Sequence, residues 1–109
     1  MKLRLEKPWL DLNAENVRRL PGQLGVYQVA GADGAVEHIG YAGARELFGL
    51  RSALERELAA HPSGARFRVE VNSQYQSRWR ELLMLHVMDH GTLPPGNESD
   101  RPATLGRLS

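Results

Sequence analysis

A short glycine-containing turn between two strand-like segments constrains the fold of this chain most. Residues 24–30 and 36–41 are rich in valine, isoleucine and tyrosine, and Asp33 and Gly34 lie between them. An Asp-Gly pair between two such runs is typical of a β-hairpin, because its backbone readily adopts the positive φ angles of a tight turn. The sequence therefore predicts two neighbouring antiparallel strands.

Hydrophobic spacing predicts two helices and a third strand after the hairpin. Leucines recur at helical spacing over residues 46–60, and a second helix is predicted over 77–90, with Ser77 and Gly91 as its caps. Residues 66–71 alternate polar and apolar side chains, which is the pattern of a half-buried strand. The order strand, strand, helix, strand, helix predicts an α+β fold, with a small three-stranded antiparallel sheet flanked by helices.

Length and composition indicate one domain. We predict a single domain over residues 1–97, with the motifs described below in 20–97, followed by a polar, flexible tail over 98–109. No apolar run approaches the roughly 18–20 residues that cross a bilayer, and the first residues lack the apolar core of a signal peptide. The chain has no cysteine, which excludes disulfides and thiolate zinc sites. A cytoplasmic location without membrane partners is expected.

The overall charge is nearly balanced. The formal net charge is +1, from 14 basic and 13 acidic side chains. A domain that depends mainly on phosphate contacts usually carries a clearer basic excess. The net charge therefore gives no support to nucleic-acid binding, although it leaves room for a local basic patch.

Two charged side chains lie near the apolar stripes of the predicted helices. On a helical wheel, Arg51 falls within roughly 20° of Leu58, so it either extends from the core margin into solvent or serves as a functional cation. Glu81 has Met84 and Leu85 as neighbours one turn away, where a carboxylate needs a cation. That cation is either a metal ion or an ion-pair partner such as Arg51, and the pattern leaves both interpretations open.

His86 and His90 stand four residues apart on the second predicted helix. This spacing places two imidazoles on one helix face, as in zinc sites. No third ligand is evident and Asp89 lies beside them, so a polar outer face is the favoured interpretation.

Five short features occur in the order, and on the elements, of one known family. They are Leu-Pro-Gly at 20–22, Gly-Val-Tyr at 25–27, His-Ile-Gly at 38–40, the arginine and glutamate of the two helices, and Pro-Pro-Gly-Asn at 94–97. This set resembles the GIY-YIG nuclease superfamily, with a histidine in place of the second signature tyrosine. The resemblance implies the α+β fold of that superfamily and a divalent-metal-dependent endonuclease that hydrolyses DNA phosphodiester bonds.

The resemblance implies catalytic roles for four residues. Tyr27 would activate the attacking water together with His38, whose imidazole can accept a proton near neutral pH. Arg51 would contact the scissile phosphate, and Glu81 would be the protein ligand of one Mg²⁺ or Mn²⁺ ion. These groups would have to meet in one pocket on the sheet.

Three further residues are predicted to support substrate binding. They are Tyr41, Arg45 and Asn97, of which Asn97 would tie the strands to the final loop. DNA is the expected partner, and a protein partner or a homodimer is left open. Two alternatives remain beside the endonuclease: a catalytically inactive GIY-YIG-derived module that binds nucleic acid or protein, and a structural domain in which Arg51 pairs with Glu81.

Overall fold

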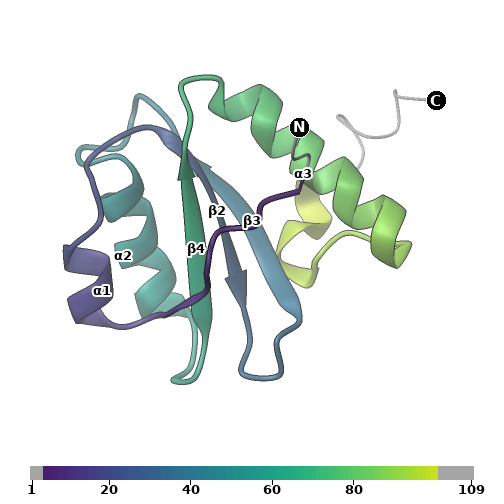
Figure 1. Ribbon diagram of the computed structural model, residues 1–109, viewed down its shortest axis with the longest axis horizontal. Coiled ribbons are helices and arrows are strands. Elements are labelled where there is room, and N and C mark those ends of the chain that lie inside the picture. The colour runs from purple at the N-terminus through teal and green to yellow at the C-terminus, as the bar shows by residue number, and fades with distance from the viewer. Residues whose placement is uncertain (1–3, 101–109) are drawn as a thin grey trace.

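The computed structural model describes residues 4–100 and folds them into three layers, with helices on both faces of one sheet (Figure 1). The elements are β1 (Leu10–Asp11), α1 (Ala14–Arg18), β2 (Gly25–Ala30), β3 (Val36–Ala42), α2 (Leu50–Ala60), β4 (Arg66–Val71), α3 (Tyr75–His90) and the 3-10 helix η1 (Pro95–Asp100). The predicted α+β class is confirmed. Within the described residues, the structure contains no helix with the length and apolar character that crossing a membrane requires.

The sheet is antiparallel and has four strands in the order β1-β4-β2-β3. The prediction of three strands is therefore wrong by one edge strand. That strand, β1, pairs Leu10 with Phe67 of β4. Two residues are too short to show an alternating pattern, which is why the sequence did not reveal it. The predicted hairpin between β2 and β3 is present, with Gly34 at a φ of 88° in its turn.

Strand β2 supplies side chains to two separate cores, because successive residues of a strand point to opposite faces of the sheet. Tyr27 and Val29 belong to the core beneath α1 and α2, which also contains Leu54. Val26 belongs to the core beneath α3, with Leu83. Figure 1 shows the corresponding division, with α1 and α2 on one side of the sheet and α3 on the other.

Both long helices have boundaries that differ from the predicted ones. Helix α2 begins at Leu50, because the preceding loop passes close to Gln23 with Gly49 at a φ of 53°. A Cβ atom on that glycine would lie 2.3 Å from the carbonyl oxygen of Gln23. Helix α3 begins at Tyr75, two residues before the predicted cap. Its end at Gly91, in the left-handed conformation, agrees with the prediction.

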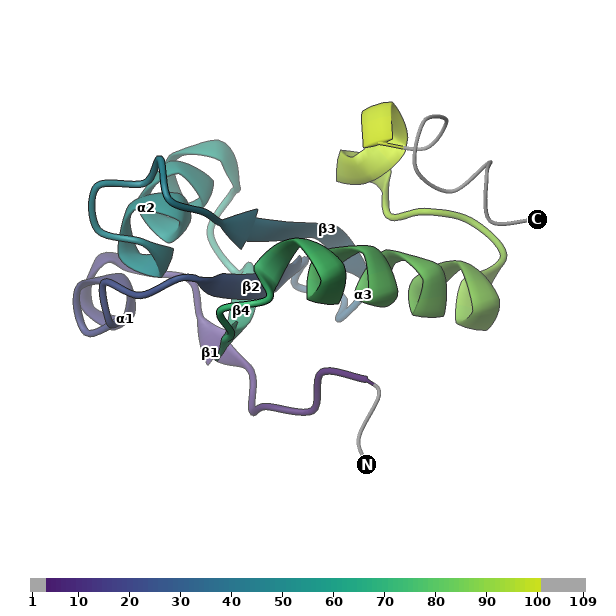
Figure 2. The ribbon, with the colours of Figure 1, turned by 90° about the horizontal axis from the view of Figure 1, so that it is seen from above.

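The segment after α3 returns to the edge strand β3 as η1 (Figure 2). Asn97 is completely buried there, where its side chain accepts a hydrogen bond from Ile39 N and donates one to Ile39 O, each at 2.8 Å. Of the predicted flexible tail, residues 98–100 belong to η1, and 101–109 lie outside the described residues. The amide of Asn97 thus ties η1 to β3.

Candidate functional site

Tyr27, the predicted first catalytic residue, is buried beneath α2 with 3% of its surface exposed. Its hydroxyl donates a hydrogen bond to Oε2 of Glu57 at 2.6 Å. Burial, followed by the negative charge of Glu57 and this hydrogen bond, raises the pKa of Tyr27 well above its ordinary value. The phenol therefore stays protonated at neutral pH, where it acts as a hydrogen-bond donor.

Glu57 is the centre of a group of polar side chains at the start of β3. His61 lies with Nε2 2.9 Å from Oε1 of Glu57, and His38 with Nε2 3.5 Å from Oε2. The rings of Tyr27 and His38 are 5.9 Å apart between centroids, so the structure brings these two predicted catalytic residues together. The other ring nitrogen of His38 lies 3.2 Å from the carbonyl oxygen of Gly96, which can only accept a hydrogen bond.

These side chains border a pocket of about 470 Å³, which we call the Glu57 pocket. Its lining residues are Glu37, His38, Glu57, Ala60, His61, Pro95 and Gly96. The second nitrogen of His61 lies 3.4 Å from a carboxylate oxygen of Glu37. Every imidazole nitrogen of this pocket therefore lies within 3.5 Å of an acceptor oxygen of the protein.

Arg51, the predicted phosphate ligand, is held against the segment that precedes β2. Its Nε donates to the carbonyl oxygen of Leu20 at 3.1 Å, and its guanidinium lies 5.4 Å from the centroid of the Phe48 ring. The side chain is partly buried, as its place at the margin of the helix stripe predicted. These contacts assign it a structural role in anchoring the entry to the sheet.

Glu81, the predicted metal ligand, lies on α3 and pairs with Arg78. Arg78 also donates to both carboxylate oxygens of Glu70 on β4, at 2.8 and 3.1 Å. The alternative of a structural ion pair thus agrees with the structure, with Arg78 as the partner in place of Arg51. The expected common pocket does not form, because Tyr27 faces α2 whereas Glu81 belongs to the helix on the opposite face of the sheet.

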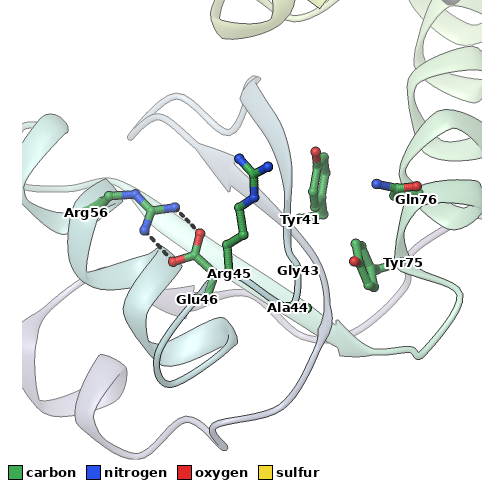
Figure 3. A pocket seen from close by; sticks show the side chains of 8 residues that line it. All are labelled: Tyr41, Gly43, Ala44, Arg45, Glu46, Arg56, Tyr75 and Gln76. Carbon is green, nitrogen blue, oxygen red and sulfur yellow. Dashed lines mark hydrogen bonds and ion pairs between the residues drawn. The ribbon is translucent and has the colours of Figure 1, made fainter.

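A larger pocket of about 630 Å³ lies at the other end of β3 (Figure 3). It is lined by Tyr41, Gly43, Ala44, Arg45, Glu46, Arg56, Tyr75 and Gln76, and we call it the Arg45 pocket. β3, the loop after it, α2 and the first turn of α3 all contribute side chains. The structure therefore brings together two of the predicted substrate-binding residues, Tyr41 and Arg45, whereas the third, Asn97, lies in η1.

The aromatic side of the Arg45 pocket is fixed by its packing. The rings of Tyr41 and Tyr75 are stacked with centroids 5.5 Å apart and an interplanar angle of 27°. Trp79 meets Tyr41 edge-on at 5.1 Å and donates its indole N–H to Ile39 O at 2.8 Å. Gly43 allows this close packing, because a Cβ atom there would lie 3.0 Å from the Tyr75 ring. Tyr41 remains partly exposed, at 36%.

The charged side of the pocket contains two arginines in different states. Arg56 forms two hydrogen bonds with the carboxylate of Glu46, at 2.6 and 2.8 Å. Arg45 is exposed and has no hydrogen-bond or ion-pair partner within residues 4–100. Its guanidinium lies between Arg56 and Tyr41 in Figure 3. The pocket therefore carries one uncompensated positive charge.

Sequence reasoning missed the residues that complete both pockets. Glu57 and His61 are four residues apart at the end of α2, a spacing that brings side chains together and that was an available signal. Tyr75 and Gln76 gave no such signal, because the predicted start of α3 at residue 77 placed both outside the helix.

Metal-ligating side chains do not converge in the part of the chain that the structure describes. No group of three or more His, Cys, Asp or Glu residues is arranged there to hold a metal ion. The His86 and His90 rings are 4.4 Å apart, and Nδ1 of His86 lies 2.8 Å from Thr92 O, the acceptor of that contact. Burial lowers the pKa of His86, which disfavours its charged form.

Comparison with known proteins gives one match. The model of a family described as "Domain of unknown function (DUF7508)" matches residues 1–89. No curated protein and no solved structure matches the chain.

Proposed function

For this chain, which belongs to the DUF7508 family, we propose a GIY-YIG-derived module that binds nucleic acid through the Arg45 pocket. The observation that carries the proposal is the guanidinium of Arg45, which has no partner within residues 4–100 and lies beside the exposed ring of Tyr41. Arginine side chains bind phosphate oxygens, and aromatic rings stack on bases. The pocket offers both groups within one open space.

The arrangement of the strands supports the GIY-YIG part of the proposal. Tyr27 pairs with Gly40 in the β2–β3 register, so the two signature motifs lie side by side. Asn97 joins η1 to the backbone of Ile39, within the second motif. These contacts bring together three motifs that lie apart in the sequence. They support descent from a nuclease fold, whether or not the protein cleaves DNA.

Binding to labelled DNA at low salt, followed by fluorescence anisotropy, tests the proposal. Arg45→Ala should weaken binding roughly fivefold, since it removes one exposed charge contact. It should also reduce the slope of the logarithm of the binding constant against the logarithm of salt concentration by about 1. Arg18→Ala is the matched control, because Arg18 is also an exposed arginine but does not line the pocket. It lies on α1, which packs beside α2 (Figure 1). Equal affinities for both variants, or no binding by the wild type, would contradict the proposal.

A second candidate function is the metal-dependent endonuclease that the sequence resemblance implies. The proximity of the Tyr27 and His38 rings favours it. The proposed Mg²⁺ or Mn²⁺ ligand does not fit this pair, because Glu81 binds Arg78 on the other face of the sheet. The residues present therefore do not fit a metal-assisted step, which makes the endonuclease the weaker candidate.

Cleavage of supercoiled and branched DNA in Mg²⁺ or Mn²⁺ separates the two candidates. The binding module predicts no metal-dependent cleavage by the wild type. Cleavage that Glu81→Ala abolishes, and that the exposed control Glu55→Ala retains, would establish the endonuclease instead. Binding without cleavage would leave the module as the function.

A further inference from the structure

We infer that the Arg45 pocket accepts one unpaired nucleotide, with its base against the Tyr41–Tyr75 pair and its phosphate on Arg45. The inference rests on the proposed function and specifies its ligand. It distinguishes a single strand, or an unpaired position in a longer nucleic acid, from an intact duplex. Three properties of the pocket support it: its aromatic wall, its single free charge and its free amide.

The aromatic wall suits an exposed base. Tyr41 stacks on Tyr75 and meets Trp79 at a steep angle, and 36% of the residue's surface remains exposed. The hydrogen bond from Trp79 to Ile39 holds this group in place before any ligand arrives. A base within a duplex is already stacked on both faces, whereas an unpaired base has a free face to place on an aromatic ring.

The charge of the pocket suits one phosphate. Glu46 occupies the guanidinium of Arg56 with two hydrogen bonds, so Arg45 is the pocket cation that has no partner within residues 4–100. A surface that follows a duplex backbone neutralises several phosphates at once. Within this pocket, one guanidinium without a partner among residues 4–100 is instead matched to a single phosphate group.

The third property is an amide on the wall opposite Arg45. Gln76 is exposed in the first turn of α3, and Figure 3 shows its side chain directed toward Tyr41. Among residues 4–100 it has no hydrogen-bond partner. An amide offers two donors and one acceptor, which is the combination that reads the edge of an unpaired base. The pocket volume of about 630 Å³ lies within the usual range of small-ligand sites, roughly 300–1,000 Å³.

The test compares three ligands of equal length: a single strand, its duplex, and a single strand in which the bases are replaced by abasic sites. The single strand should bind the wild type at least about tenfold more tightly than the other two. Tyr41→Leu should remove most of this preference, and Tyr41→Phe should retain it, because the phenyl ring still stacks. Gln76→Ala is a second variant at an exposed position, where folding is not at stake, and should weaken binding of the base-containing single strand but not of the duplex or the abasic strand.

The outcomes separate the inference from the proposed function. Equal binding of single strand, duplex and abasic strand, with Arg45→Ala still weakening all three, would overturn the unpaired-base inference and leave nucleic-acid binding intact. Absence of binding to every ligand would overturn both. A nucleoside monophosphate, added as competitor, identifies the source of the nucleotide: displacement at micromolar concentration indicates a free nucleotide, and displacement only by the strand indicates a nucleic acid.

Discussion

The two pockets along β3 differ in how fully their polar groups are satisfied. In the Glu57 pocket, a carboxylate receives a hydrogen bond from Tyr27, and each imidazole nitrogen faces an acceptor in the protein. In the Arg45 pocket, one guanidinium and one amide have no partner among residues 4–100. Groups that already satisfy one another stabilise the fold, whereas unsatisfied exposed groups remain available to a ligand. The comparison therefore assigns stability to one end of β3 and binding to the other.

The largest effect is expected at Gly40 of β3, which packs against the Tyr27 ring that donates to Glu57. In Gly40→Ala, the new Cβ atom would lie 2.4 Å from the buried Tyr27 ring, so the strands must shift. We expect a loss of about 3 kcal/mol in the free energy of unfolding, at the upper end for an overpacked core. Denaturant unfolding measures it. Gly22→Ala is the control, because its Cβ would find only ordinary contacts, and an equal loss in both variants would refute the steric explanation.

A smaller loss of stability is expected at Glu57. Glu57→Ala leaves the Tyr27 hydroxyl and the His61 ring without their acceptor. An unsatisfied buried group costs about 1–3 kcal/mol, and the free energy of unfolding should fall by that amount. The exposed neighbour Glu55→Ala should change it by less than about 0.5 kcal/mol.

The same variant sharpens the comparison between the pockets. DNA affinity of folded Glu57→Ala should equal that of the wild type. A loss of affinity as large as that of Arg45→Ala would show that the Glu57 pocket also binds the ligand, and the division of roles would be incorrect.

At the Arg45 pocket, removing a charge should strengthen binding. Glu46→Gln eliminates the carboxylate that neutralises Arg56 and so releases a second cation into the pocket. We expect DNA affinity to rise about two- to fivefold, with a steeper salt dependence. Anisotropy titrations at two or more salt concentrations measure both quantities. Unchanged affinity would mean that the ligand does not reach this side of the pocket.

The smallest effect concerns His86, which lies outside both pockets and should make the free energy of unfolding depend on pH. Its pKa is lowered in the folded protein, mainly by burial. As the pH falls below about 6.5, the unfolded chain therefore takes up a proton before the folded one, and the free energy of unfolding should decrease. His86→Asn should flatten the stability profile in this window. A profile with the same slope in both proteins would contradict the assignment to His86.

The local elements of this fold follow from the sequence, and the meeting of distant side chains follows only in part. The Asp33-Gly34 turn, the alternation over 66–71 and Gly91 are short-range signals, and each has the predicted structure. The late start of α2 depends on the approach of Gly49 to Gln23, which no local pattern contains.

The site illustrates the same limit. Tyr41 and Arg45 lie in one pocket, since Arg45 follows Tyr41 by four positions, in the loop just after β3. Tyr27 and Glu81 do not meet, because the alternation of β2 directs Tyr27 toward α2 and away from α3. Which face each helix covers is a property of the whole fold, so a helical wheel alone placed Glu81 near the core without showing which core.

The most direct test of the account is an NMR titration of the labelled protein with a short single-stranded oligonucleotide. The account predicts that the backbone amide shifts concentrate in residues 41–46 and 75–76, around the exposed guanidinium and the stacked rings. It also predicts that residues 37–38, 57–61 and 95–96 remain unchanged. The reverse pattern, with shifts confined to the satisfied end of β3, would contradict it.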